Sequence, residues 1–279
     1  TFGDITFVDS EGAVDLDSSA SANGDLYIDA QTDGAVGGTL SITANGVITQ
    51  NVDLTVTGTT TLEAGSGNDI TLNRAGNNFA TVIVTSGRNV DLQDAGAIGL
   101  GASTVSGTYD VTASGNIDDF GALVITGLTT LAAGSGNDVT LDETSNNFQG
   151  GLIITSGTDV FLRSTGAMEL GAATVSGTYS VTAGGAITQI GDLSIGGVTT
   201  LVAGGNAITL DRAGNNFQAA VIITSDRNVQ LVDAGAIDLG ASTVTGTYAV
   251  TATAGGDITN SDVLTITGTA TFTAAGGQS

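Results

Sequence analysis

The strongest constraint on the fold is a sequence that repeats itself about every 70 residues. The copies span residues 59–127, 128–197 and 198–268, and a fourth begins within 269–279. Equivalent phenylalanines lie 69 residues apart, at Phe79, Phe148 and Phe217. A fixed period of this kind is typical of solenoids, in which each unit buries its apolar face against its neighbours. We therefore expect one elongated domain over residues 1–279.

Within each copy, short apolar runs alternate with polar residues at every second position. In the run RNVDLQ, Val90 and Leu92 alternate with Asn89, Asp91 and Gln93. Alternation in short segments bounded by Gly, Asn and Asp is typical of half-buried strands. No stretch has the apolar spacing of a helix, so the sequence predicts an all-β protein.

Each copy divides into pieces that hold three short apolar runs apiece. The pieces of the first copy are Thr59–Gly87, Arg88–Gly107 and Thr108–Gly127. Three strands per piece is what one turn of a coiled parallel sheet requires, with turns stacked about 4.8 Å apart. We predict a right-handed parallel β-helix (β-solenoid) of about twelve turns, three strands per turn, and roughly 55 Å long. Residues 1–38 form two diverged turns in this scheme, 39–58 one plain turn, and each repeat three turns.

Composition excludes several function classes. The chain has no His, Cys or Lys, which removes Ser-His-Asp and Cys-His catalysis, Schiff bases and His- or Cys-ligated metals. The net charge is −23 with only five Arg, so we expect no nucleic-acid partner. No run is long and apolar enough to embed the chain in a membrane as a helix.

Carboxylates are the remaining chemistry. The adjacent pairs Asp118–Asp119 and Asp142–Glu143 could serve a glycosidase. Neighbours on a strand point to opposite faces, so a pair within a strand does not converge. We expect no catalytic residues and no enzyme. The phrases AGSGNDITL and AGSGNDVTL resemble a Ca²⁺-binding nonapeptide, but they lack its first Gly and its tandem repetition. We expect no cofactor and leave open weak surface binding of Ca²⁺.

An Asn-Asn-Phe motif sits in the longest piece of every copy. We expect it to form small protrusions on one side of the rod, recurring every third turn at about 14 Å. They could contact a partner through Asn77, Asn78, Phe79, Asn146, Asn147, Phe148, Asn215, Asn216 and Phe217. The structural alternative is that the Asn residues shape a bend and the Phe closes the edge of the core.

Several phrases carry a family resemblance. GNDITL, NNFQG, NVDLQDAGAIGLGASTVSG and VTAGGAITQ resemble the repeats of filamentous-haemagglutinin-like exoproteins of Gram-negative bacteria. These are large adhesins, many of them exported by two-partner secretion. The resemblance implies a right-handed β-helix, export to the outer surface or the medium, and a role in adhesion, aggregation or biofilm. It transfers no site residue by residue, and the family's N-terminal secretion domain is not evident.

We therefore weigh three functions. The first is a structural stalk of a secreted or cell-surface adhesin that displays a binding region. The second is a rod that itself binds a glycan or protein of a host or bacterial surface through the Asn-Asn-Phe motif. The third is a subunit that associates with itself, laterally or end to end, into a filament or sheath. Both ends stop within the repeat pattern, so we expect a longer parent polypeptide.

Overall fold

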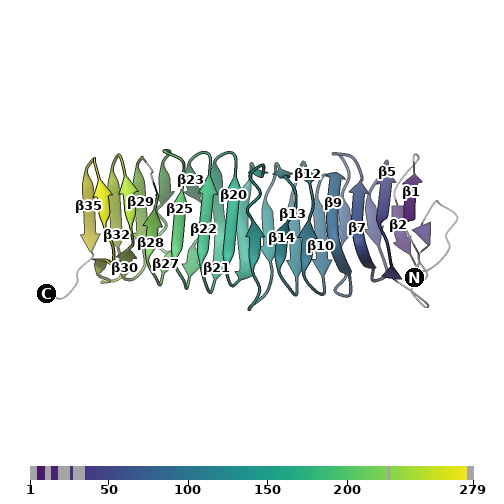
Figure 1. Ribbon diagram of the computed structural model, residues 1–279, viewed down its shortest axis with the longest axis horizontal. Coiled ribbons are helices and arrows are strands. Elements are labelled where there is room, and N and C mark those ends of the chain that lie inside the picture. Colours follow the sequence, from purple (N-terminus) through teal and green to yellow (C-terminus); the bar gives the residue numbers. More distant parts are fainter. Residues whose placement is uncertain (1–4, 10–13, 18–25, 28–34, 225–226, 275–279) are drawn as a thin grey trace.

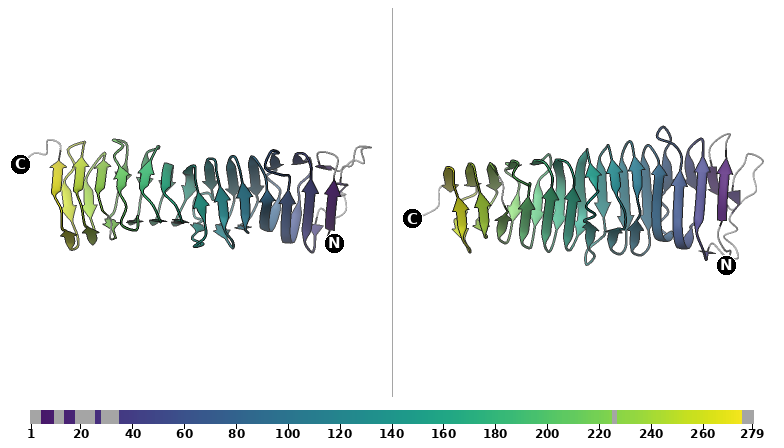
Figure 2. Two further views of the ribbon diagram at one scale, coloured as in Figure 1. Left: turned by 90° about the horizontal axis from the view of Figure 1, so that it is seen from above. Right: turned by 45° about the horizontal axis from the view of Figure 1, so that its top comes forward.

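The protein is a straight rod of stacked β-strands along which the sequence runs from one end to the other (Figure 1). The computed structural model describes residues 5–9, 14–17, 26–27, 35–224 and 227–274. In these residues the fold is all-β, with parallel strands stacked as a β-solenoid of about 12 turns, as the repeat predicts. The two further views in Figure 2 show the same elongated shape. No helix long and apolar enough to span a membrane occurs in this described part.

Two long sheets run the length of the rod, and we call them sheets A and B. Sheet A contains β1 (Ile5–Asp9), β4 (Ala35–Val36), β5 (Leu40–Ala44), β7 (Thr55–Glu63), β9 (Asn78–Ser86), β11 (Ile98–Leu100), β14 (Ile117–Asp119), β17 (Val139–Leu141), β20 (Val160–Ser164), β22 (Tyr179–Ala183), β25 (Thr199–Val202), β28 (Val221–Ile223), β30 (Ile237–Leu239) and β33 (Ile258–Asn260). Sheet B contains β2 (Val14–Asp17), β3 (Leu26–Tyr27), β6 (Ile48–Gln50), β8 (Ile70–Leu72), β10 (Val90–Asp94), β13 (Tyr109–Ala113), β16 (Thr129–Ala132), β19 (Gly151–Gly157), β21 (Met168–Val175), β23 (Ile187–Gln189), β24 (Leu193–Ile195), β26 (Ile208–Leu210), β27 (Asn216–Phe217), β29 (Val229–Asp233), β32 (Tyr248–Ala252) and β35 (Ala270–Ala274).

Two short sheets complete the set. The first contains β12 (Ser103–Val105), β15 (Leu123–Ile125) and β18 (Asn147–Phe148), and the second contains β31 (Ser242–Val244) and β34 (Leu264–Ile266). Their strands form a narrow third side of the coil between sheets A and B.

The core is built from columns of like residues on successive turns. Ile98, Ile117, Val139 and Val160 are paired in register on four consecutive turns of sheet A, and each is fully or almost fully buried. The alternation read from the sequence is also present: β10 buries Val90, Leu92 and Asp94 and leaves the residues between them partly exposed. Stacking at about 4.8 Å lets each apolar side chain contact its equivalents above and below, which gives a continuous narrow core.

Each repeat contains three and a half turns, and not the three that we expected. Between β10 and β20, which begin at equivalent residues, the chain passes through seven strands of the two long sheets: β10, β11, β13, β14, β16, β17 and β19. These strands alternate between sheets B and A, and one full turn uses one strand of each. Because seven is odd, β10 lies in sheet B, whereas its equivalent β20 lies in sheet A and the next equivalent, β29, is again in sheet B.

The third side of the coil therefore changes place from copy to copy. Val36, Val56 and Phe79 stack where the chain passes from sheet B to sheet A. In the next copy, Val105, Ile125 and Phe148 stack where it passes from A to B. The third copy returns to the first arrangement, with Phe217 following Ile195. Figure 1 shows this alternation, with β12 at the upper edge of the rod and β27 at the lower edge.

This alternation corrects the expected placement of the protrusions. Loops 73–76 and 211–214 share one side of the rod, and loop 142–145 lies on the opposite side. Two copies that share a side are seven turns apart, or about 34 Å. Most of the predicted turns in 1–38, and the last residues of 269–279, lie outside the described residues.

Candidate functional site

The Asn-Asn-Phe motif is mostly internal. Its first Asn is completely buried in every copy (Asn77, Asn146 and Asn215), and its Phe is no more than 2 % exposed (Phe79, Phe148 and Phe217). The middle residue is exposed in Asn78 and Asn216 and half-buried in Asn147. The exposed part of each protrusion is the loop just before the motif. A partner can therefore reach only the middle Asn of each motif without opening the core.

The first Asn joins two successive turns through its side-chain amide. Asn77 Nδ2 donates to Gln50 Oε1 at 2.8 Å, and Gln50 Nε2 donates back to Asn77 Oδ1 at 2.7 Å. The same Oδ1 accepts the backbone N–H of Leu54 at 2.9 Å. Asn215 repeats this arrangement with Gln189, with both amide–amide distances at 2.8 Å. The reciprocal pair satisfies polar groups that would be costly to bury without partners.

The middle copy replaces this Gln with Asp119. Asn146 Nδ2 donates to Asp119 Oδ2 at 2.5 Å, and the backbone N–H of Asp142 donates to Asp119 Oδ1 at 3.1 Å. The carboxylate is 7 % exposed. Asp118, its neighbour, faces the opposite side of strand β14, so the two carboxylates do not converge.

A second buried polar residue lies on the other side of the motif. The Phe79 N–H donates to Asp94 Oδ2 at 2.6 Å, and the Phe217 N–H donates to Asp233 Oδ2 at 2.7 Å. The next turn has no third-side strand at this level, so the aspartate replaces the missing backbone carbonyl. In the middle copy the Phe148 N–H instead donates to Ser164 Oγ at 3.3 Å.

We call each set of three residues a staple: Gln50–Asn77–Asp94, Asp119–Asn146–Ser164 and Gln189–Asn215–Asp233. Each staple contains one buried carboxylate, although the middle copy carries it at the opposite end. Burial raises the pKa of Asp94, Asp119 and Asp233, and their hydrogen bonds offset this only in part. Every staple closes the end of a three-strand third side, which is a structural role.

The exposed loops carry different charges on the two sides of the rod. In loop 73–76, Arg74 Nε lies 2.7 Å from Asp53 Oδ1, and in loop 211–214, Arg212 Nε lies 2.6 Å from Asp192 Oδ1. The middle loop has Asp142 and Glu143 instead. Ion pairs this exposed contribute little to stability.

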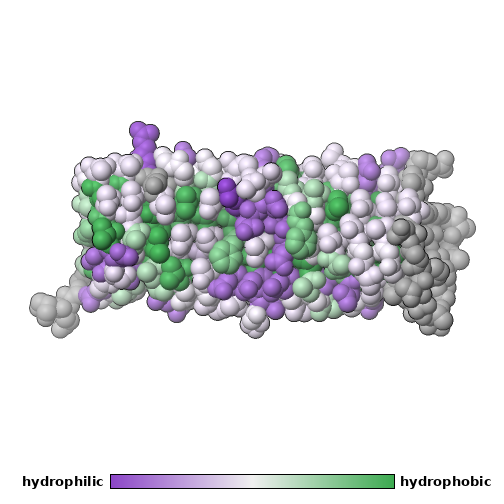
Figure 3. Space-filling model, in the orientation of Figure 1, coloured by the Kyte–Doolittle hydropathy of each residue, from purple (hydrophilic) through white to green (hydrophobic). Residues whose placement is uncertain are grey.

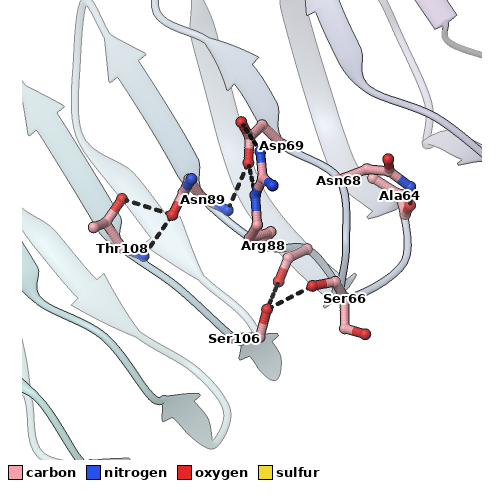
Figure 4. Close-up of polar contacts among 9 residues, drawn as sticks. Ala64, Ser66, Asn68, Asp69, Arg88, Asn89, Ser106 and Thr108 are labelled. Atoms are coloured by element: carbon pink, nitrogen blue, oxygen red, sulfur yellow. Dashed lines mark hydrogen bonds and ion pairs between the residues drawn. The ribbon is translucent and has the colours of Figure 1, made fainter.

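A polar ladder lines the edge where the chain passes from sheet A to sheet B in the first copy (Figure 4). Arg88 donates from Nε and Nη2 to the two carboxylate oxygens of Asp69, both at 2.7 Å. The Asn89 N–H donates to Asp69 Oδ1 at 3.1 Å, and Asn89 Oδ1 accepts the Thr108 N–H at 3.1 Å. The hydrogen bond from Arg88 lowers the pKa of Asp69. Side-chain oxygens thus accept hydrogen bonds from the backbone N–H groups that have no strand partner at the corner.

The glycine-rich phrases of the sequence form the corner beside this ladder. Gly65 and Gly134 have φ angles of 80° and 82°, which favour glycine. Asn68 and Asn137 close the corner by donating from Nδ2 to the carbonyls of Ala64 and Ala133, both at 2.8 Å. In the ranges that the structure describes, no group of three or more carboxylates is arranged to hold a metal ion.

The surface drawn in Figure 3 is largely of intermediate hydropathy, with a hydrophilic area midway along the rod and separate apolar spots. The most exposed large apolar residues are Val263, Phe120 and Ile190. Phe120 and Ile190 occupy equivalent positions of successive copies and so lie on opposite sides of the rod. Among the described residues, these two exposed side chains therefore do not share one apolar face.

Comparison with known proteins identifies the repeat. No curated protein and no solved structure matches the chain. One family model matches four consecutive segments, residues 11–86, 87–155, 157–224 and 226–279, which together cover nearly the whole sequence. Its description is "Repeats of unknown function (DUF5649)". The chain belongs to this family of repeats.

Proposed function

We propose that this chain is a rod segment of a secreted or cell-surface adhesin that holds a binding region away from its anchor. The observation that carries the proposal is the unbroken core. Buried Val, Ile and Leu columns run from Val36 to Val250, and both long sheets continue across every repeat boundary. Side chains of chemical interest, such as the staple carboxylates, serve to close the coil.

The arrangement of the hydrogen bonds suits a stiff rod. In a solenoid the backbone hydrogen bonds between turns run along the axis of the rod. Each turn is therefore bonded to the next by rows of hydrogen bonds in both long sheets. Bending is resisted because sheets A and B are both continuous.

The finer assignment rests on the resemblance to filamentous-haemagglutinin-like exoproteins. An acidic chain without cysteine suits a polypeptide that crosses an export pore unfolded and folds outside the cell. Its charge of −23 favours separate, soluble rods over non-specific association. Two-partner export, adhesion and biofilm formation are part of this proposal.

Binding assays on the purified chain test the stalk role. The stalk proposal predicts no saturable binding to neutral host-cell or bacterial glycans, and an extended particle of roughly 55 Å in small-angle scattering. Saturable glycan binding that is lost on replacing Asn78, Asn147 and Asn216 together with Ala would contradict it. That result would favour the rod as the binding module, since these are the motif residues that reach the surface.

A further inference from the structure

The three copies differ at one position of the polar ladder. Copies 1 and 2 carry Asp69 and Asp138 there, whereas copy 3 carries Ala207. In copy 1 the carboxylate receives the Arg88 guanidinium and the Asn89 N–H. In copy 2, Asp138 Oδ1 accepts the N–H of Asp159 at 3.0 Å. The alanine of copy 3 supplies no acceptor at this place.

The backbone around Ala207 nevertheless keeps the frame of copy 1. The Ile208 N–H donates to the Asn228 carbonyl at 2.8 Å, which matches the 2.8 Å bond from Ile70 to Asn89. Register agrees as well, because Ile208 pairs with Val229 just as Ile70 pairs with Val90.

The rest of the ladder is also conserved between the two copies. Asn228 Oδ1 accepts the Thr247 N–H at 3.0 Å and the Thr247 hydroxyl at 3.2 Å. Asn89 and Thr108 form the same two bonds in copy 1. Arg227 directly precedes Asn228, as Arg88 precedes Asn89, and it is exposed. Copy 3 therefore keeps the Asn228 N–H in the same frame and an exposed Arg at the sequence position of Arg88, without the carboxylate.

A surface pocket opens at this position. Its volume is about 120 Å³, and it is lined by Ala207, Ile208, Thr209, Asn228, Val229, Gln230, Thr247 and Ala249. Three of these side chains, Thr209, Gln230 and Thr247, end in groups that hydrogen-bond to hydroxyls. The pocket thus combines a place for a carboxylate with polar groups beside it.

We propose that this pocket binds a uronic acid, either free or as a residue of an acidic polysaccharide. The sugar carboxylate takes the place that Asp69 fills in copy 1, where it accepts hydrogen bonds from the Asn228 N–H and the Arg227 guanidinium. The ring hydroxyls bond to Thr209, Gln230 and Thr247. A charge-assisted pair of this kind is stronger than a bond between neutral groups.

The negative charge of the rod does not prevent such binding at physiological salt. Exposed charges more than about 8 Å apart are largely screened at 0.15 M ionic strength. A guanidinium in direct contact with the ligand acts well within this distance. The binding test is accordingly run at 0.15 M NaCl.

The test follows backbone amide resonances during titration with glucuronate, and with glucose as the neutral control. We expect saturable shifts at Asn228 and Thr247 with glucuronate and none with glucose. Arg227→Gln should weaken binding about tenfold, the equivalent of about 1.4 kcal/mol. Ala207→Asp should abolish binding, because its own carboxylate then occupies the place as Asp69 does.

A gain-of-site variant keeps the test independent of these losses. In copy 1, Asp91 and Asp110 stand where copy 3 has Gln230 and Ala249. The triple variant Asp69→Ala, Asp91→Gln, Asp110→Ala should therefore create a second site at Asn89 and Thr108 and raise the stoichiometry from one to two. No glucuronate shift in the parent chain, or equal binding by the parent and Ala207→Asp, would overturn the proposal. Equal binding of acetate or of an aspartyl peptide would overturn the assignment to a sugar. Shifts with a polyuronate identify the polymer as a source, and shifts with glucuronate alone identify the free acid.

Discussion

Asn146 donates from its side-chain nitrogen to the buried carboxylate of Asp119, 2.5 Å away on the preceding turn. In the neighbouring copies a glutamine takes the place of Asp119, and the carboxylate lies beyond the motif phenylalanine instead. The buried carboxylate thus lies at one end of the staple in the first and third copies and at the other end in the middle copy. Each staple contains one such carboxylate. This makes the Asn-Asn-Phe motif an internal closure of the coil, repeated once per copy.

Replacing Asn77 with Ala should destabilise the first copy by about 2–4 kcal/mol. The substitution leaves the half-buried Gln50 amide without one of its partners and the buried Leu54 N–H without its acceptor, and each such group costs about 1–3 kcal/mol. The matched control is Asn78→Ala, which changes an exposed residue and should shift stability by less than about 0.5 kcal/mol. Hydrogen exchange of strands β7 to β10 measures the local effect, and equal protection in both variants would argue against the staple.

The rod should become more stable as the pH falls from neutrality through the folded pKa values of its buried aspartates. Burial raises the pKa of Asp94, Asp119 and Asp233 in the folded state, so the folded rod binds these protons more tightly than the unfolded chain. Stability therefore increases as the pH falls through the folded pKa values toward the unfolded value of about 3.9, and it decreases as the pH rises. Asp69 acts in the opposite sense, since Arg88 lowers its pKa.

Urea midpoints at several pH values check this dependence. The triple variant Asp94→Ser, Asp119→Gln, Asp233→Ser uses residues that the chain itself carries at equivalent positions, and it should flatten the dependence. Neutralising three exposed carboxylates instead, Glu169, Asp211 and Asp257, changes the net charge equally and should leave most of the dependence in place. The reverse ranking of the two triple variants would contradict the role of the buried groups.

Replacing Tyr179 with Phe should stabilise the rod by about 1 kcal/mol. The Tyr179 hydroxyl is buried without a hydrogen-bond partner, and Ala173 stands where the first copy has Ser103. Removing a buried polar group that lacks a partner recovers its desolvation cost. The control is Tyr109→Phe. The Tyr109 hydroxyl also lacks a hydrogen-bond partner, but Ser103 lies close enough to lower its pKa, so this variant should gain less. A lower thermal midpoint for Tyr179→Phe than for the parent chain would refute this expectation.

The fold class followed from the sequence because period-2 alternation and a 70-residue repeat have few other solutions. The half turn did not follow, because it depends on the third-side strands Asn147–Phe148 and Asn216–Phe217, and two residues are too few to be recognised as a strand. The turn after each motif also has no third-side strand, since Ala95 connects sheets B and A directly after β10. Both features are decided by pairing with neighbouring turns.

The staple residues were partly visible in the sequence. Asp94 continues the inward set of Val90 and Leu92, so alternation alone places it inside. Its partner on the motif is a backbone N–H, which no side-chain pattern reveals. Gln50 and Asp119 differ in type and charge, and only the alignment of the turns shows that both form a hydrogen bond with the first Asn of the motif. Partner contacts were predicted for Asn77 and Phe79 because the motif has the composition of an exposed loop. The structure buries both residues.

Distances between spin labels test the central feature most directly, which is a repeat of three and a half turns that places successive copies on opposite sides of a rod. The chain has no cysteine, so Ala75, Thr144 and Ala213 in the three exposed loops can be replaced in pairs and labelled. We predict about 34 Å between labels at 75 and 213, which share a side seven turns apart. The 75–144 and 144–213 distances should be similar, and their sum should clearly exceed the 75–213 distance, because the middle label lies across the rod. Two short distances that add up to the long one would place all three loops on one side and contradict the account.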